Sequence, residues 1–207
     1  MTGYLITFEG IDLSGKSVQA NLLYQRLVDS GYDTIFFRDP GTTRISERIR
    51  EILLDSRHLE MSPWTELLLY EAARAQMVEE YIKPALAKGS IVVGDRLFDS
   101  TTAYQGYGRQ LDLQLVSQAN IIGACGVCPN LTFLIDIDPQ IALSRQNQRK
   151  GKTDRLEDED QNFHNRVRKG YLEIAKKEVN RFIVIDGTHS IARIQQKIWD
   201  IVIQKIN

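Results

Sequence analysis

Short apolar runs recur along the chain, and longer stretches with helical spacing of apolar residues separate them. The runs are rich in β-branched and aromatic residues and cover Tyr4–Phe8, Thr34–Phe37, Ile91–Val93, Leu131–Ile137 and Phe182–Ile185. They are continuously hydrophobic, which is typical of strands that are buried on both faces. Because such runs alternate with helical stretches, the pattern predicts an α/β fold with a five-stranded parallel sheet covered by helices.

Glycine and proline positions indicate where the expected helices end. Gly31 follows the helical stretch after the first run, and Gly89 follows a long apolar stretch over Trp64–Leu86. Pro84 is expected to bend the end of that second helix. No internal repeat and no low-complexity linker interrupts the pattern. We therefore expect a single domain over residues 1–207.

Composition narrows the possible partners. The 207 residues are 43% hydrophobic and 26% charged, which fits a globular protein with one core. The 26 Lys and Arg nearly balance the 27 Asp and Glu, so we expect no nucleic-acid partner, and recognition of phosphate must be local. No apolar run approaches the roughly 18 residues of a membrane span, and the chain begins without a basic signal-peptide start. We expect a cytoplasmic protein.

The two cysteines, Cys125 and Cys128, form a C-x-x-C segment. Structural zinc needs about four ligands, and the sequence offers neither a second cysteine pair nor a nearby histidine. A metal or redox role is the alternative interpretation. We expect two small buried residues at the end of a helix, before a turn at Pro129-Asn130.

The strongest chemical signal directly follows the first apolar run. Residues 10–17 read Gly10-Ile11-Asp12-Leu13-Ser14-Gly15-Lys16-Ser17, a complete G-x-x-x-x-G-K-[ST] motif between a strand and a helix. Its glycines let backbone N–H groups wrap around phosphates at a positive helix N-terminus. Lys16 is expected to bridge the β- and γ-phosphates, and Ser17 to bind Mg²⁺. The motif predicts a P-loop NTPase-type three-layer sandwich; a glycine-rich turn without a ligand is the alternative.

A P-loop alone does not define a reaction, because switches, motors and kinases share it. The N-K-x-D string with which GTPase switches read their base does not occur in the sequence. A kinase needs a second pocket that binds an anion. Arginines stand beside carboxylates or aromatic rings in three further segments: Arg38-Asp39-Pro40-Gly41, Tyr70-Glu71-Ala72-Ala73-Arg74 and Asp95-Arg96.

These segments are candidates for the acceptor site, over about residues 38–106. Strand ends and the loops after them line the ligand crevice of α/β proteins, so we expect the segments to converge near Lys16. Tyr70 and Arg74 lie four residues apart and share one face of a helix. Each residue taken singly also fits a simpler role, as a surface ion pair for the arginines or as a core residue for Tyr70.

Together with Ser100-Thr101-Thr102-Ala103-Tyr104-Gln105-Gly106, these motifs resemble those of bacterial thymidylate kinases, over about residues 4–186. The shared pieces are the P-loop with its acid, an R-[DE]-P-G loop, an aromatic-x-x-x-Arg helix, the Asp-Arg pair and S-x-x-A-Y-Q-G. The resemblance implies the reaction ATP + dTMP → ADP + dTDP, dependence on Mg²⁺, a mobile lid and a homodimer packed through helices. A kinase for uridylate, guanylate or adenylate, or a non-catalytic nucleotide-binding regulator, is the alternative.

The resemblance also implies how the acceptor phosphate and base are held. Arg74 and Arg96 are expected to hold the phosphate of dTMP, while Arg38 and Asp39 shape that side of the pocket. Tyr70 is expected to stack on thymine.

The S-x-x-A-Y-Q-G segment carries the remaining substrate contacts that the resemblance implies. Thr101 and Gln105 are expected to contact the base or sugar, and Ser100 to support them. Tyr104 is expected to lie beneath the deoxyribose. From the P-loop, Asp12 is expected to reach the 3′-hydroxyl or a metal-bound water.

Phosphoryl transfer requires mainly alignment and neutralisation of charge, because the acceptor phosphate is already a nucleophile. No general base is expected. The catalytic candidates on the strands and the P-loop are Lys16, Arg96 and Asp12. The candidate metal ligands are Ser17 and Asp95, with Asp95 orienting metal-bound waters.

A further cation is expected from a lid over about residues 145–160. The P-loop has no arginine at positions 11–14, so charge on the transferred group must be met from elsewhere. The lid stretch is basic around a glycine and is similar to lids that supply a catalytic arginine in family members. Arg149 and Arg155 are the candidates; a solvated basic turn is the alternative.

Overall fold

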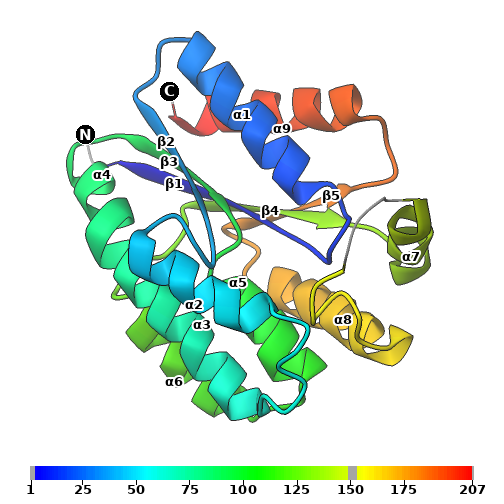
Figure 1. The fold of residues 1–207 in the computed structure, drawn as a ribbon. Coiled ribbons are helices and arrows are strands. Elements are labelled where there is room, and N and C mark those ends of the chain that lie inside the picture. Colours follow the sequence, from blue (N-terminus) through cyan, green and yellow to red (C-terminus); the bar gives the residue numbers. More distant parts are fainter. Residues whose placement is uncertain (1–2, 149–152, 207) are drawn as a thin grey trace.

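The chain folds around a five-stranded parallel sheet (Figure 1). The computed structural model describes residues 3–148 and 153–206. The strand order is β2-β3-β1-β4-β5. The strands are β1 (Tyr4–Glu9), β2 (Thr34–Arg38), β3 (Ile91–Asp95), β4 (Leu131–Asp136) and β5 (Phe182–Asp186). The predicted α/β fold with five parallel strands is confirmed.

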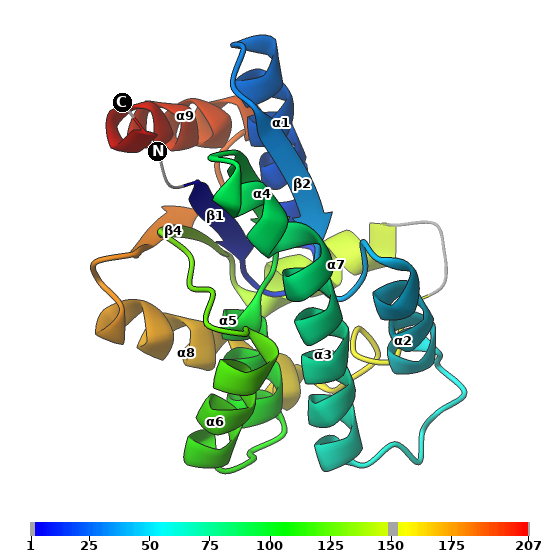
Figure 2. The same ribbon diagram turned by 90° about the vertical axis from the view of Figure 1, so that its left-hand side faces the viewer.

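Helices cover both faces of the sheet and produce three layers (Figures 1 and 2). One face is covered by α1 (Lys16–Asp29) and α9 (Ile191–Ile206). The other is covered by a larger group that includes α3 and α8. The elements outside the first face are α2 (Arg44–Leu54), α3 (Pro63–Met77), η1 (Val78–Ile82), α4 (Lys83–Ala87), α5 (Phe98–Thr101), η2 (Thr102–Gly108), α6 (Leu113–Gly123), α7 (Pro139–Gln148) and α8 (Gln161–Lys177).

Alternate residues of the central strand β1 serve the two faces of the sheet. Ile6 and Phe8 are fully buried in a cluster that includes Leu23 of α1 and Ile198 of α9. Leu5 points to the opposite face and packs in a cluster with residues of α3, η1 and α4. Because both faces are covered by helices, the strand has no solvent-exposed face and reads as a largely apolar run.

The long apolar stretch predicted as one helix changes its winding before Pro84. Helix α3 ends at Met77, a π-helical turn covers Val78–Ile82, and α4 follows at Lys83–Ala87. Pro84 lies in the first turn of α4, where its missing N–H is tolerated. The expected distortion is present, but the chain accommodates it in the turn before the proline.

The Cys125–Cys128 segment follows α6, as predicted, but the prediction that both cysteines are buried is wrong. Cys125 is half-buried and Cys128 is exposed. Partial burial is the first cause that raises the pKa of the half-buried Cys125 thiol. Within residues 3–148 and 153–206, no group of three or more His, Cys, Asp and Glu side chains is placed to hold a metal ion.

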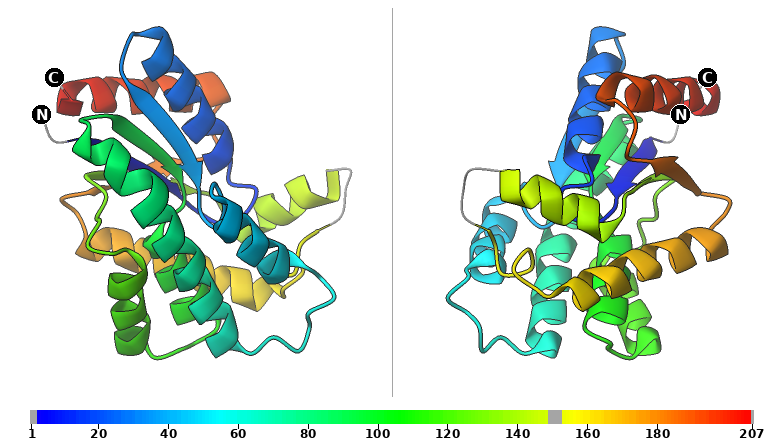
Figure 3. Two further views of the ribbon diagram at one scale, coloured as in Figure 1. Left: turned by 60° about the vertical axis from the view of Figure 1, so that its left-hand side comes forward. Right: turned by 90° about the vertical axis from the view of Figure 1, so that its right-hand side faces the viewer.

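None of the helices in the described ranges is long and apolar enough to cross a membrane. The cytoplasmic location stays a prediction. Figure 3 shows α7 at the carboxyl edge of the sheet, beyond the end of β4, with the segment that leads into α8 returning beneath it. The functional residues described below gather at this edge.

Candidate active site

The P-loop connects β1 to α1 at the carboxyl edge of the sheet. Gly10 adopts φ 143°, and a Cβ on it would lie 2.5 Å from the carbonyl oxygen of Ile135, so only glycine fits there. Gly15 adopts φ 99° and precedes α1 without a side-chain cap. The first N–H groups of α1 therefore remain available to an anion. Lys16 is 6% exposed, and its Nζ lies 3.5 Å from Oδ1 of Asp12.

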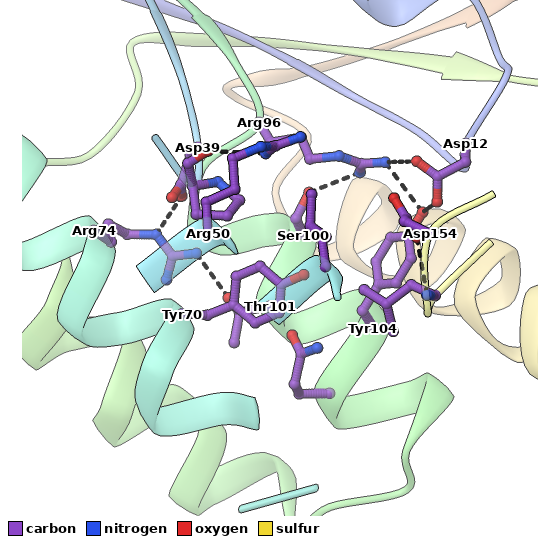
Figure 4. Close-up of a pocket in the computed structure, with 14 residues that line it drawn as sticks. Asp12, Asp39, Arg50, Tyr70, Arg74, Arg96, Ser100, Thr101, Tyr104 and Asp154 are labelled. Atoms are coloured by element: carbon purple, nitrogen blue, oxygen red, sulfur yellow. Dashed lines mark hydrogen bonds and ion pairs between the residues drawn. The ribbon is translucent and has the colours of Figure 1, made fainter. Parts of the chain in front are cut away.

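Arg96 joins the P-loop to the second pocket (Figure 4). It follows β3 and adopts φ 73°, a conformation that costs free energy for a side chain with a Cβ. Its guanidinium holds this position through hydrogen bonds to five acceptors: the Gly10 carbonyl at 3.0 Å, Ser100 at 3.0 Å, the Tyr171 hydroxyl at 2.9 Å, Asp12 at 2.5 Å and the Tyr104 hydroxyl at 3.1 Å.

Asp12 is an ionised carboxylate at the centre of this network. Burial alone would raise its pKa, but the charges of Arg96 and Lys16 and a hydrogen bond from Tyr104 hold the pKa well below its ordinary range. The Tyr104 hydroxyl donates to Asp12 Oδ2 at 2.6 Å. Asp12 of the P-loop is thus linked to Arg96 and to Tyr104, which both line the second pocket.

The second pocket, called the acceptor pocket below, lies between α2, α3, η2 and the segment before α8. Figure 4 shows Tyr70, Thr101 and Arg74 on one side of it and Asp12 on the other. Tyr70 and Tyr104 are nearly buried. The lining residues are Asp12, Asp39, Pro40, Arg50, Leu54, Tyr70, Arg74, Arg96, Ser100, Thr101, Tyr104, Gln105, Asp154 and Leu156.

Arg74 is held in the wall of this pocket by two carboxylates. It is 1% exposed; its Nε donates to Asp39 Oδ2 at 2.6 Å and its NH1 to Glu71 Oε1 at 2.5 Å. Its NH2 donates to Thr101 Oγ1 at 2.8 Å. A phosphate beside Arg74 would also lie beside two carboxylates, which repel it. The geometry therefore favours contact of Arg74 with a neutral part of a ligand, although the sequence predicted contact with phosphate.

Arg50 on α2 is a cation of the acceptor pocket that the sequence interpretation missed. Its NH1 donates to the Pro40 carbonyl at 2.9 Å, and no carboxylate among the described residues forms an ion pair with it. Burial lowers its pKa first, and the charge of Arg38 adds to this effect. The nearby charges of Glu47 and Asp154 oppose this effect only in part, so an anionic ligand would add negative charge that favours the charged form of Arg50.

A broad opening joins the P-loop to the acceptor pocket. Lys16, Ser17, Asp95 and Arg96 line it from the donor side, and Arg50 lines it from the acceptor side. The buried Oδ1 of Asp95 has no hydrogen-bond partner among the described residues. Hydroxyl and carboxylate oxygens are the ligands that Mg²⁺ prefers, so Ser17 and Asp95 fit a magnesium ion.

The remaining arginines of the sequence prediction lie in three different situations. Arg38 is half-exposed, and its NH2 pairs with Glu47 at 3.0 Å. Arg155 is 7% exposed; its Nε donates to the Leu53 carbonyl at 3.2 Å and its NH2 lies 2.6 Å from Glu66. Arg149 lies outside the described residues. Of the lid candidates, Arg155 is thus committed to a buried ion pair.

Arg145 of α7 belongs to the basic stretch predicted as the lid, but it was not among the predicted catalytic residues. Its NH1 donates to the carbonyls of Leu13 at 2.8 Å and Ser14 at 3.2 Å, and its NH2 to the carbonyl of Gly187 at 3.2 Å. It therefore ties the P-loop to the turn after β5.

Glu9, the last residue of β1, was also missed. It is fully buried and accepts hydrogen bonds from the backbone N–H of Leu97 at 2.8 Å, from Ser100 at 2.6 Å and from Tyr171 at 3.0 Å. Burial, and then the charge of Asp99, raise the pKa of Glu9 to about 7. Ser100 and Tyr171, which donate to Glu9, also accept hydrogen bonds from Arg96, so Glu9 helps to hold Arg96 in place through them.

The sequence carried a weak signal for some of these residues. Glu9 directly precedes the first glycine of the P-loop, a position that could have suggested a role. Tyr171, Asp154 and Arg50 stand in helical or polar stretches without a recognisable motif. Their place at the site follows from the folding of α2, α8 and the segment before α8 toward the carboxyl edge of the sheet.

Comparison with known families gives one family over nearly the whole chain. The family model described as thymidylate kinase matches residues 8–198. A thymidylate kinase of Sulfurihydrogenibium sp. is 49% identical over 199 residues, with 96% of each chain covered. A thymidylate kinase of Caldanaerobacter subterraneus is 47% identical over 198 residues, which cover 96% of this chain and 94% of the relative.

A solved structure gives the same result for the fold. The crystal structure of thymidylate kinase from Ehrlichia chaffeensis superposes with a TM-score of 0.79 at 33% sequence identity. The match covers 98% of this chain and 99% of the other. The arrangement of strands and helices is therefore shared over nearly the full length of both chains.

Proposed function

The chain belongs to the thymidylate kinase family, and from this premise we propose that it transfers the γ-phosphoryl group of ATP to dTMP. An oxygen of the dTMP phosphate forms a bond to the γ-phosphorus while the bond between the γ-phosphorus and the β,γ-bridging oxygen breaks. The products are dTDP and ADP. The observation that carries the proposal is the position of Arg96, which contacts both the P-loop and the acceptor pocket.

On the donor side, the P-loop N–H groups and Lys16 hold the β- and γ-phosphates. The buried position of Lys16 strengthens its interaction with charge, because water is excluded from its surroundings. Ser17 and Asp95 would hold Mg²⁺, which neutralises phosphate charge when it is bound. The orphaned Oδ1 of Asp95 supports this placement.

On the acceptor side, Arg96 and Arg50 hold the phosphate of dTMP. Arg96 pairs with one carboxylate, Asp12, whose charge Lys16 also offsets, and Arg50 has no ion-pair partner among the described residues, so both can contact an anion. Arg74, with Thr101, contacts the thymine base, and Tyr70 stacks on that base. This arrangement aligns the two phosphates in the shared opening, which is the main requirement of phosphoryl transfer.

The catalytic arginine of the lid is assigned to Arg149. Arg155 is paired with Glu66 inside the protein, and this pairing fixes the segment that returns from the lid to α8. Arg149, the other arginine of the sequence prediction, would neutralise charge on the transferred group.

A homodimer formed through α3 and α6 is part of the proposal. Leu68 of α3 is 63% exposed and Ile122 of α6 is 74% exposed, and the two helices pack side by side (Figure 2). Large apolar side chains on adjacent helices favour a protein interface. Sedimentation of the wild type and of Leu68→Asp tests this part: a dimer that becomes monomeric supports it, and a monomeric wild type contradicts it.

The reaction is tested by ADP release with a panel of nucleoside monophosphates. A coupled assay with dTMP, UMP, GMP and AMP at equal concentration, with Mg²⁺ and ATP, should show the highest kcat/KM for dTMP. The same assay without an acceptor measures the background hydrolysis of ATP. Preference for another monophosphate would contradict the choice of acceptor, and ADP release that no monophosphate stimulates would contradict a kinase.

A further inference from the structure

Glu66 of α3 is a buried carboxylate that contacts the acceptor pocket only through another residue. It is fully buried, and it does not line the pocket itself. Its Oε1 accepts from Gln105 Nε2 at 2.8 Å and from Arg109 Nε at 3.1 Å. Its Oε2 accepts from Arg109 NH2 at 3.0 Å and lies 2.6 Å from Arg155 NH2.

The two arginines keep Glu66 ionised. Burial would raise the pKa of Glu66, but hydrogen bonds from Arg109 and Gln105 and the charge of Arg155 lower it below its ordinary value. An ionised carboxylate accepts hydrogen bonds and has no proton to donate. Gln105 must therefore present its Nε2 to Glu66, and the orientation of its amide follows from the chemistry of the partner.

The other end of this amide faces the acceptor pocket. Gln105 is 1% exposed and lines the pocket together with Tyr70 and Thr101. Among the described residues, no donor forms a hydrogen bond with its Oε1. This oxygen is also not among the fully buried atoms without a partner, so part of it remains accessible. The small exposed area of the side chain thus includes an acceptor that opens toward the pocket.

The geometry points to Glu66 as a specificity-determining positioning residue, which fixes Gln105 Oε1 as the acceptor for the ring N–H of a pyrimidine. This inference rests on the proposed function, because it concerns the base of the same substrate. Thymine and uracil carry a hydrogen on N3, which Oε1 can accept. The N3 of cytosine carries none, so two acceptors would face each other in its place.

Thr101 complements this pattern with a donor. Its Oγ1 accepts from Arg74 at 2.8 Å, so its own hydrogen is free for an acceptor in the pocket. The 4-carbonyl oxygen of thymine and uracil is such an acceptor, whereas cytosine has an amino group there. One donor and one oriented acceptor together match the edge of thymine and uracil.

The ratio of kcat/KM for dUMP to that for dCMP measures this recognition, because the two bases differ only at N3 and at position 4. In Glu66→Gln the new amide can donate to Gln105 Oε1, so the amide of Gln105 can turn and present N–H to the base. The ratio should fall roughly 10- to 100-fold, the effect of one mismatched buried hydrogen bond. Gln105→Leu should lower it to a similar extent, and the double variant should lower it no further.

Glu159→Gln is the matched control. It removes the second carboxylate partner of Arg109 without touching Gln105, so the dUMP to dCMP ratio should stay at the wild-type value. The inference is overturned if Glu66→Gln lowers kcat/KM for both substrates equally, or if Glu159→Gln shifts the ratio as much. If Glu66→Gln fails to fold, Gln105→Leu decides, and an unchanged ratio overturns the inference.

The same measurements separate this inference from the proposed function. A wild type without dTMP-dependent release of ADP would contradict both. A wild type that phosphorylates dTMP, with variants that keep the wild-type ratio of dUMP to dCMP, would contradict the role of Glu66 alone.

Discussion

Replacement of Tyr104 by phenylalanine separates two roles that the structure gives to one side chain. The hydroxyl donates to Asp12 Oδ2 at 2.6 Å and accepts from Arg96 at 3.1 Å. The ring is 4% exposed and packs edge-on against Phe163 and Tyr171. Tyr104→Phe removes the hydroxyl and keeps the ring, while Tyr104→Ala removes both.

The structure sets the size of the expected effects. A hydrogen bond to a charged group contributes about 1.5–3 kcal/mol, and a loss of that size at Asp12 corresponds to a roughly 10- to 150-fold decrease in kcat/KM for dTMP. Tyr104→Phe should show this decrease and keep the wild-type ratio of dUMP to UMP, because the ring that would crowd a 2′-hydroxyl remains. Tyr104→Ala should lower that ratio and destabilise the fold by about 3–5 kcal/mol.

The assay is kcat/KM for dTMP, dUMP and UMP with all three proteins, together with thermal melting to confirm that each variant is folded. Unchanged turnover in Tyr104→Phe would refute a functional link from Tyr104 through Asp12 to Arg96. A ratio of dUMP to UMP that stays at the wild-type value in Tyr104→Ala would refute the ring as a barrier to ribose, and would leave it only a packing role.

Three further predictions follow from particular contacts. Lys16→Ala should abolish turnover and remain folded by its melting transition; near-normal kcat would remove Lys16 from the donor site. Arg155→Ala should lower the free energy of unfolding by about 1–3 kcal/mol, because Glu66 loses a buried partner. Arg149→Ala should lower kcat without a change in melting temperature. A loss of kcat in Arg155→Ala and a loss of stability in Arg149→Ala would exchange the two roles. The pKa of Glu9 rises from 4.5 to about 7 on folding, so the wild type should lose stability relative to Glu9→Gln as pH rises across that interval, in urea unfolding at each pH; parallel curves would show that Glu9 does not titrate there.

The sequence predicted where every strand begins, and it missed the last residue of each strand. Each predicted run starts at the residue where its strand starts, for example Tyr4 and Phe182. Four of the strands end at a charged residue that a search for apolar runs excludes, for example Glu9 and Asp95, whereas the predicted run for β4 continues one residue past Asp136. These ends lie at the carboxyl edge of a parallel sheet, where α/β proteins bind their ligands. The apolar pattern therefore did not predict the strand ends at the edge of the sheet where the site lies.

The residues of the candidate site could be named from motifs, but their partners could not. The sequence placed Arg74 and Arg96 near one another without indicating that Asp39 and Glu71 surround Arg74. It also could not indicate that α2 brings Arg50 to the same pocket, because that contact depends on how α2 packs. Ion pairs between distant segments follow from tertiary packing, which local patterns do not encode.

The central claim is that the γ-phosphoryl group of ATP moves to dTMP at the junction held by Arg96. The most direct test is to incubate the wild type with Mg²⁺, dTMP and ATP that carries a radioactive γ-phosphate, and to separate the products by chromatography. The account predicts that the label appears in dTDP, in amounts equal to the ADP formed. Label found only in inorganic phosphate, at the same rate with and without dTMP, would contradict it.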